Sequence, residues 1–193
     1  DMAGFSVGVV EHDQIVYGTQ AIRSGDVLIG LASSGFHSNG YSLVRKAVTE
    51  VGGLSYADHV PELGVTVGEA LLEPTRLYVR SVLDVLDDES LRPSVHGLAH
   101  ITGGGLPENI TRILPKDCRV HIDCSSWQRP TLFNWLQNLA GIATDEMYRV
   151  FNMGIGFVLV VAPEAVSGVL AKLEPHNFGA KVIGEVVAGE AGV

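Results

Sequence analysis

The sequence predicts an α/β or α+β fold in which helices pack on a mixed β-sheet. Short apolar runs bounded by turn residues are typical of buried strands, and longer segments place apolar residues on one helical face. The two kinds of segment alternate along the chain without a repeat, a low-complexity tract or a linker. With 193 residues, 46% hydrophobic and 18% charged, the chain is long enough to bury one sizeable core. We therefore expect a single domain over residues 1–193.

The strands are predicted from apolar runs that are too short for helices. Residues 4–10 form a mostly apolar run, and residues 15–17 are expected to return beside it as a hairpin after a turn at residues 11–14. This hairpin argues against a purely parallel sheet. The remaining predicted strands are 27–32, 95–101, 120–123, 155–161 and 181–187.

Helices are predicted where apolar residues recur at helical spacing. Thr66 and Glu69 fit a capping box that opens a short helix, which stops at Pro74. Thr75 is expected to cap the next helix. The residues expected to face inward from that helix are Leu77, Val82, Leu83 and Leu86. The other predicted helices are 41–51, 106–114, 130–140 and 163–173.

The charge balance argues against two classes of partner. The chain has 13 basic and 22 acidic residues, a formal net charge of -9, whereas nucleic acids and anionic membranes require a basic surface. No apolar run reaches the length of a membrane span. We expect neither nucleic acid nor membrane as a partner, and any bound anion must be held by local geometry.

The two cysteines, Cys118 and Cys124, lack the spacing of a zinc site. They could form one disulfide, but buried free thiols in a reducing compartment are the favoured interpretation. The chain begins at Asp1 instead of Met, close to the first strand-like run, so we expect a fragment cut at a domain boundary.

Two glycine-rich loops share one design. The strand 27–32 runs into Ser33, Ser34 and Gly35, followed by Ser38, Asn39 and Gly40, and a helix follows. The strand 95–101 runs into Thr102, Gly103, Gly104 and Gly105, and again a helix follows. Backbone N–H groups before a helix, with hydroxyls beside them, can hold a phosphate. The alternative is that the glycines make tight turns while Ser38 or Asn39 caps a helix. Neither loop fits a known nucleotide fingerprint.

His37 and His100 are the candidate catalytic residues, one in the first loop and one at the end of the second strand. A histidine there can donate to a phosphate or transfer a proton, and the alternative is a structural hydrogen bond. His96 and His100 would share a strand face and suggest a metal pair. A third ligand with suitable spacing is missing from the sequence, so we expect no metal site.

Other features carry structural interpretations. Ser33 and Ser34 lack the G-x-S-x-G elbow of covalent catalysis. Asp1, Asp26 and Glu108 could serve as acids or bases, but surface caps are the favoured interpretation. The aromatic residues Trp127, Phe133 and Trp135 are expected in the core, and residues 152–156 form a third glycine-rich turn that bends into the last apolar strand.

Three motifs give the chain a family resemblance. Residues 33–46, SSGFHSNGYSLVRK, resemble the signature of the aminoimidazole ribonucleotide synthetase family, also called phosphoribosylformylglycinamidine cyclo-ligases. AHITGGG at 99–105, with Glu108 and Asn109, resembles the second motif of that family. Trp135, Leu136, Glu146 and Met147, together with FNMGIG at 151–156, resemble its third region. Residues 1–5 resemble the start of the family's C-terminal domain.

The resemblance implies a function. The family closes the imidazole ring of formylglycinamidine ribonucleotide in purine biosynthesis, using ATP and releasing ADP and phosphate. ATP is thought to phosphorylate the formyl oxygen, which then leaves as the ring-closing nitrogen attacks. By this resemblance, the chain is the C-terminal domain of a cytoplasmic, homodimeric parent. ATP and Mg²⁺ would be bound mainly by an N-terminal domain that is absent here.

The resemblance also directs the site assignments. A substrate phosphate or the transferred phosphate would be held by Ser33, Ser34, Gly35, Ser38, Asn39, Gly40 and the loop from Thr102 to Gly105. His37 and His100 would orient or protonate the reacting groups. Two alternatives remain open. One is a related ATP-using enzyme of the formylglycinamidine ribonucleotide synthetase or selenophosphate synthetase type. The other is a phosphate-binding module without activity of its own.

Overall fold

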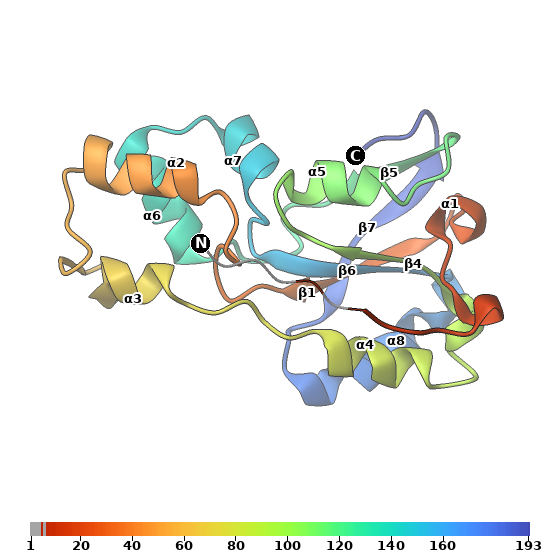
Figure 1. Cartoon of the computed structure of the whole chain (residues 1–193). Coiled ribbons are helices and arrows are strands. Elements are labelled where there is room, and N and C mark those ends of the chain that lie inside the picture. The colour runs from red at the N-terminus through yellow and green to blue at the C-terminus, as the bar shows by residue number, and fades with distance from the viewer. Residues whose placement is uncertain (1–4, 6) are drawn as a thin grey trace.

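The computed structural model describes residues 5 and 7–193. It places a five-stranded sheet beside a lobe of helices (Figure 1). The strand order is β4-β6-β1-β7-β5, and each neighbouring pair is antiparallel. The strands are β1 Val27–Ala32, β4 Val95–His100, β5 Cys118–Ile122, β6 Ile155–Val161 and β7 Lys181–Ala188. A two-stranded ribbon joins β2 His59–Val60 to β3 Val65–Thr66.

The α/β class is confirmed, but the expectation of a mixed sheet is wrong in its detail. β1 and β4 run in the same direction and are each followed by a helix, a pattern that suggests parallel neighbours. In the fold, β6 lies between them and pairs antiparallel with both. The alternation of strands and helices along a sequence does not show which strand inserts between two others.

Helices cover both faces of the sheet. The helices are α1 Gly18–Ala21, α2 Tyr41–Arg45, α3 Val67–Leu71, α4 Val79–Leu86, α5 Gly105–Thr111, α6 Thr131–Ala140, α7 Thr144–Val150 and α8 Val166–Leu173. A π-helix, Lys46–Val51, continues α2, and 3₁₀ turns occur at His12–Gln14, Arg92–Ser94, Pro163–Ala165 and Glu174–His176. Figure 1 shows α5 on one face of the sheet and α4 with α8 on the other.

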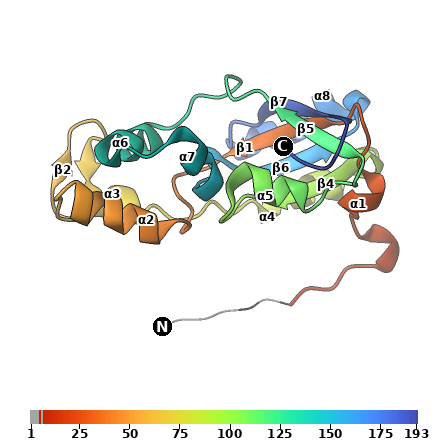
Figure 2. The ribbon, with the colours of Figure 1, turned by 90° about the horizontal axis from the view of Figure 1, so that it is seen from above.

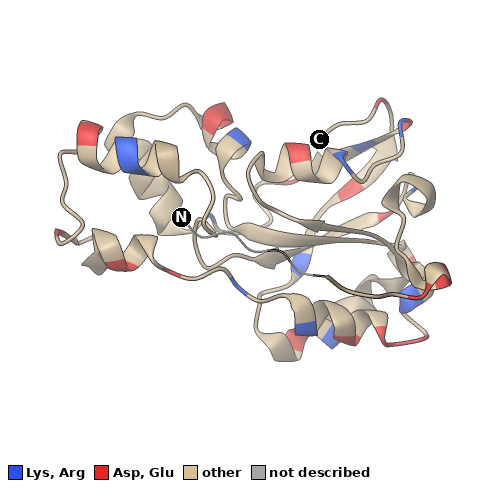
Figure 3. Cartoon of the chain, in the orientation of Figure 1, with Lys and Arg blue, Asp and Glu red and all other residues tan. Residues whose placement is uncertain are grey.

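The core divides into three clusters because adjacent residues of a strand face opposite sides. On β1, Leu28 packs with α5 on one face, and Ile29 packs with α4 and α8 on the other. A third cluster, around Phe36, Phe133 and Phe151, fills the helical lobe. Trp127, Phe133 and Trp135 are all buried, which confirms their expected place in the core, although they belong to two clusters. Figure 3 shows the charged residues mainly on helices and outer loops, with few on the central strands.

The predicted N-terminal hairpin is wrong where the structure describes it. Residues 1–4 and 6 lie outside the described part, and residues 7–10 and 15–17 form no strand. Phe5, Val7 and Val9 are 94%, 84% and 99% exposed. Figure 2 shows this segment leaving the body of the fold beyond α1. Its apolar alternation gives it the capacity to form a strand, but no described strand lies beside it to pair with.

The capping box is confirmed, but the expected cap of the following helix is wrong. Thr66 and Glu69 exchange both bonds of the box at the start of α3. α4 begins only at Val79, and Thr75 does not cap it. Leu77 and Leu83 are exposed, while Val82 and Val85 face the core. The reason is that residues 74–78, which we call the strap, form no helix, and the side chains of Arg76 and Tyr78 are tied to the end of β1.

Three further expectations are corrected. Asp26 is buried and accepts bonds from the Arg23 amide at 2.9 Å and from His96 Nδ1 at 2.7 Å, so it is not a surface cap. His96, which is bonded to Asp26, and His100 lie at opposite ends of β4, whose register shifts between Val95 and Gly97, so the two histidines do not form a pair. Both cysteines are free, but only Cys118 is buried.

Candidate functional site

The topology brings three glycine-rich loops to one edge of the sheet. β1 and β4 end at the edge where the antiparallel β6 begins. Residues 33–40 follow β1, residues 101–105 follow β4, and residues 152–154 precede β6. We call residues 33–40, 100–105 and 152–156 the loop edge. The predicted site residues, scattered along the sequence, all lie in this region.

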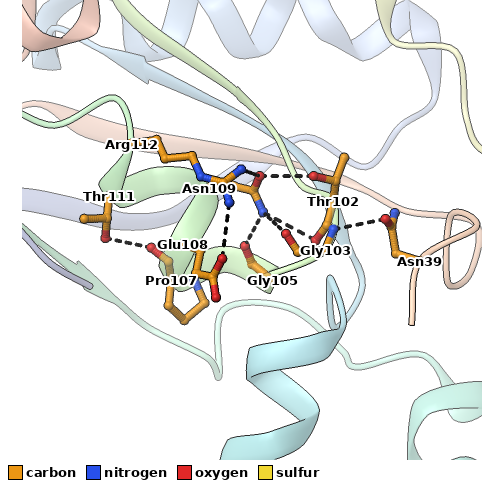
Figure 4. Close-up of polar contacts among 9 residues, drawn as sticks. All are labelled: Asn39, Thr102, Gly103, Gly105, Pro107, Glu108, Asn109, Thr111 and Arg112. Atoms are coloured by element: carbon orange, nitrogen blue, oxygen red, sulfur yellow. Dashed lines mark hydrogen bonds and ion pairs between the residues drawn. The ribbon is translucent and has the colours of Figure 1, made fainter. Parts of the chain in front are cut away.

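Asn39 ties the first loop to the second (Figure 4). Its Oδ1 accepts a hydrogen bond from the Gly103 amide at 3.0 Å, and its Nδ2 donates to the His37 carbonyl at 2.7 Å. Asn39 and Gly103 are 64 residues apart in the sequence. The bond holds the two predicted phosphate loops side by side.

Asn152 ties the first loop to the third. Its Oδ1 accepts from the Ser33 hydroxyl and the Gly154 amide, each at 2.9 Å, and its Nδ2 donates to the Gly35 carbonyl at 2.8 Å. The side chain is buried, with 2% of the residue exposed. Sequence reasoning placed this segment in the third family motif and interpreted it as a bend, but did not name Asn152 as a site residue. A signal was available, because a short amide beside two glycines can brace a turn.

Asn109 holds the second loop through its side-chain amide (Figure 4). Its Nδ2 donates to the carbonyls of Gly105, Gly103 and Thr102, at 2.8, 3.3 and 3.4 Å. Its Oδ1 accepts from the Thr102 hydroxyl at 3.1 Å and from Arg112 Nη1 at 3.3 Å. The loop is therefore fixed before any ligand binds.

Left-handed backbone conformations gather at the loop edge. His37 and Ser38 have φ values of 53° and 59°, and Met153 has 51°. Non-glycine residues adopt such values only at an energetic cost, and they are concentrated at functional sites. Gly105 has φ +59°, and a Cβ there would lie 2.0 Å from the Tyr148 carbonyl oxygen of α7. Glycine at this position is thus required for packing against α7.

The strap forms a further wall beside the first loop, and sequence reasoning missed it. The Ser34 hydroxyl donates to the Pro74 carbonyl at 2.7 Å. Arg76 Nη1 and the Tyr78 hydroxyl both donate to the Ala32 carbonyl, at 3.0 and 2.8 Å. The strap therefore brings a cation to the end of β1.

His37 is buried, with 3% of the residue exposed. Its Nε2 accepts a hydrogen bond from the Ser34 amide at 3.0 Å and lies 3.5 Å from the Arg76 amide. An accepting Nε2 leaves the proton on Nδ1, which has no partner among the described residues. Burial, with the charges of His100 and Arg76, lowers the pKa of His37 to about 4. The imidazole is therefore neutral at physiological pH.

His100 contrasts with His37 because it is exposed at the end of β4. Its ring stacks on Phe157 with 6.2 Å between centroids and meets the edge of Tyr78 at 6.2 Å. This partial burial lowers the pKa of His100. Of the two candidate catalytic histidines, His100 is the one that solvent and ligands can reach.

The predicted phosphate-binding residues divide by accessibility. Ser38 and Gly103 are exposed. Ser33, Gly35 and Gly105 are buried. The residues of intermediate exposure are Ser34, Asn39, Gly40, Thr102 and Gly104. The buried members shape the loops, and the others line the surface that a ligand can contact. Within the described residues, no cluster of three or more His, Cys, Asp or Glu side chains could hold a metal ion.

The low pKa of His37 predicts a pH-dependent stability. The unfolded chain binds a proton on this histidine near pH 6.5, whereas the folded chain binds it only near pH 4. The unfolded state therefore holds more protons between these values, and the free energy of unfolding falls as the pH drops from 6.5 towards 4. We expect Tm to fall less over this range in His37→Asn than in the unsubstituted chain. Equal falls in thermal scans would contradict the buried neutral state.

The chain matches the family described as AIR synthase related protein, C-terminal domain, over residues 23–193. A phosphoribosylformylglycinamidine cyclo-ligase of Pseudothermotoga lettingae is 51% identical over 193 residues, which are 100% of this chain and 55% of that protein. One of Geotalea daltonii is 52% identical over 192 residues, 100% of this chain and 54% of that protein. The chain thus spans about half the length of the curated relatives it matches.

Solved structures share the fold at low sequence identity. The hydrogenase maturation protein HypE of E. coli gives a TM-score of 0.55 at 23% identity, covering 91% of this chain and 48% of that one. Thiamine-monophosphate kinase from Stenotrophomonas maltophilia gives a TM-score of 0.59 at 16% identity, and the match covers 94% of this chain and 53% of that one. T. maritima PurL complexed with FGAR gives a TM-score of 0.53 at 16% identity, and the match covers 93% of this chain and 27% of that one. At these identities the comparison concerns the fold alone. Across the part of the chain that the structure describes, no helix is both long and apolar enough to cross a membrane.

Proposed function

Because the chain belongs to the AIR synthase related family, whose C-terminal domain it matches, we propose that it is the C-terminal part of a phosphoribosylformylglycinamidine cyclo-ligase. Full-chain identities of 51% and 52% to proteins of that name favour this activity over the others found on the same fold, where identities are 23% or less in the compared structures. The family resemblance of the first loop and of the AHITGGG motif supports the same choice.

The proposed reaction closes the imidazole ring of formylglycinamidine ribonucleotide. The formyl oxygen attacks the γ-phosphorus of ATP and ADP leaves. The ring-closing nitrogen then attacks the activated carbon, and phosphate leaves with the former formyl oxygen. Both the substrate and the released product carry phosphate, so the enzyme needs fixed donors that bind phosphate oxygens.

The observation that carries the proposal is the convergence of the three loops at one sheet edge. The loops are joined by Asn39 and Asn152 before any ligand binds. A preorganised set of hydroxyl and N–H donors lowers the entropic cost of binding an anion. We assign phosphate contacts to the accessible groups of the second loop, above all Gly104, because both donors of Ser34 are already bonded, to His37 and to Pro74. We assign to His100 the orientation or protonation of the reacting groups. The buried residues Ser33, Gly35 and Gly105 would keep the loops in shape without contacting the phosphate.

ATP and Mg²⁺ are assigned mainly to a part of the protein outside these 193 residues. The described residues do not offer three grouped His, Cys, Asp or Glu side chains that could hold a metal ion. When bound, Mg²⁺ neutralises charge on the triphosphate. The chain's own contribution is to hold phosphate and position His100. We also propose a homodimeric parent located in the cytoplasm, as the family resemblance implies.

The test is turnover by the full-length protein that carries this chain. With ATP and formylglycinamidine ribonucleotide, we expect ADP, phosphate and aminoimidazole ribonucleotide in equal amounts. Glutamine-dependent or selenide-dependent turnover would instead favour a formylglycinamidine ribonucleotide synthetase or a selenophosphate synthetase. Binding of phosphate ligands by the full-length protein without any turnover would favour a binding module.

A further inference from the structure

The loop edge has no strongly basic residue of its own. Residues 33–40, 100–105 and 152–156 contain neither Lys nor Arg. The strap, residues 74–78, contains one, Arg76, and its position was not expected from any sequence motif. In a chain with a formal net charge of -9, a phosphate needs a local positive charge to offset the surrounding field.

The guanidinium of Arg76 is held in place from two sides. Nη1 donates to the Ala32 carbonyl at 3.0 Å, at the point where β1 enters the first loop. The guanidinium carbon lies 5.8 Å from the centre of the Phe178 ring. The bond to Ala32 uses one of the five N–H donors of the guanidinium. A stacked, tethered guanidinium with further donors is suited to a two-point contact with phosphate oxygens.

The main chain of Arg76 is tied to the first loop through His37. His37 Nε2 accepts from the Ser34 amide and lies within reach of the Arg76 amide, while its own Nδ1–H is buried and has no partner in the described part of the chain. The ring thus places its one acceptor between the main-chain N–H groups of Ser34 and Arg76, which belong to two separate segments. A buried group in this arrangement holds two segments together and does not reach a substrate.

The position of Glu73 indicates where beside the strap a phosphate is disfavoured. Glu73 lines a hollow of about 350 Å³ beside Ser34 and another of about 210 Å³ beside Ser38. Its carboxylate disfavours phosphate in both hollows. Neither hollow is lined by the aromatic residues near Arg76. Phe178 packs against Tyr78 with 5.3 Å between ring centroids, and Tyr78 meets His100 at 6.2 Å. This aromatic row leads from Arg76 to the accessible histidine.

We propose that Arg76 binds a phosphate group at the loop edge, and that His37 is the positioning residue that holds the Arg76 and Ser34 main chains there. The identity of the phosphate rests on the proposed function: it is either the 5′-phosphate of the ribonucleotide or a phosphate of ATP. In both cases the recognised chemistry is a phosphate dianion.

The first test measures binding without turnover. Arg76→Met keeps the aliphatic stem on Phe178 and removes the charge. In the full-length protein carrying this chain, we expect calorimetric titration with ribose 5-phosphate and inorganic phosphate to show a loss of about 10- to 100-fold in affinity. Arg80→Met, which removes an exposed positive charge from α4 four residues away, is the matched control and should change affinity less than about twofold.

Kinetics of the same variants identify the source of the phosphate. A rise in KM for formylglycinamidine ribonucleotide assigns Arg76 to the substrate phosphate, and a rise in KM for ATP assigns it to the nucleotide. If Arg76→Met fails to fold, Arg76→Lys keeps a charge but loses the two-point contact, and should weaken binding to an intermediate degree. Unchanged phosphate affinity in a folded Arg76 variant overturns the inference while leaving ring closure intact. Absence of ring closure overturns the proposed function and leaves the binding result standing.

The role of His37 is tested by comparing Ala and Asn. Asn adopts positive φ readily, and its side-chain oxygen can accept an N–H bond. We expect His37→Ala to weaken phosphate binding and His37→Asn to restore most of it. The pH dependence of kcat between about pH 5.5 and 8 should be the same in His37→Asn as in the unsubstituted enzyme. Loss of an ionisation from that profile would show that His37 transfers a proton and would overturn its positioning role.

Discussion

Replacing Asn152 with Ala is expected to lower the free energy of unfolding by about 3 kcal/mol or more and to abolish most phosphate binding. The substitution leaves the Ser33 hydroxyl, the Gly154 amide and the Gly35 carbonyl without their shared partner. Each buried polar group that loses its partner costs about 1–3 kcal/mol. Because Asn152 joins the first and third loops, the first loop should lose its fixed shape at the same time.

Urea unfolding measures the stability and calorimetry measures the binding. Asn138→Ala removes an exposed amide from α6 and should stay within about 0.5 kcal/mol of the unsubstituted chain. A stable Asn152→Ala variant with normal affinity would show that the loops hold their arrangement without the buried amide.

Replacing Gly105 with Ala is expected to cost about 3 kcal/mol, from two sources. The residue has φ +59°, and a Cβ would lie 2.0 Å from the Tyr148 carbonyl oxygen and 2.9 Å from that of Phe151. Left-handed backbone costs a residue with a Cβ about 1–2 kcal/mol, and overpacking costs about 1–3 kcal/mol more. The contact is with backbone atoms, so a side-chain rotation cannot relieve it.

Alanine variants of two other glycines distinguish the backbone cost from the packing cost. A Cβ at Gly141, with φ +61°, meets nothing within 4 Å, so its Ala variant should show the backbone cost alone. A Cβ at Gly103 meets only Asn39 Oδ1 at 3.8 Å, so its Ala variant should remain within about 1 kcal/mol of the unsubstituted chain. Urea unfolding should therefore rank stability as Gly103→Ala, then Gly141→Ala, then Gly105→Ala. An equal cost at Gly105 and Gly141 would contradict close packing of α5 on α7.

Local pattern was sufficient to predict most of the sheet. The apolar runs at 27–32, 95–101 and 155–161 lie within one residue of β1, β4 and β6, because each is buried and bounded by turn residues. The N-terminal run failed because strand formation depends on a partner as well as on alternation. Helices were also predicted at 41–51, 130–140 and 163–173, the last of which begins three residues before α8, whereas α7 was missed because its apolar stripe is short.

The candidate site was only partly visible in the sequence. Glycines and hydroxyls marked the first two loops because those residue types are unusual after an apolar strand. Asn152, Arg76 and Tyr78 were missed because their roles depend on contacts across long sequence separations, 117 residues in the case of Asn152 and Gly35. The burial of His37 could not be predicted from the sequence either, because the pattern of a polar loop does not show that the strap covers one of its residues.

The central claim is that the three loops form one phosphate-binding site. The most direct measurement is a backbone amide NMR titration of this 193-residue chain with ribose 5-phosphate. We expect the largest shift changes at Gly104, Arg76 and His100, smaller ones at Asn39 of the first loop, which is bonded to Gly103, and none on the far side at Asp26. Shift changes confined to residues outside the loop edge and the strap, or the absence of saturable changes there, would contradict the claim.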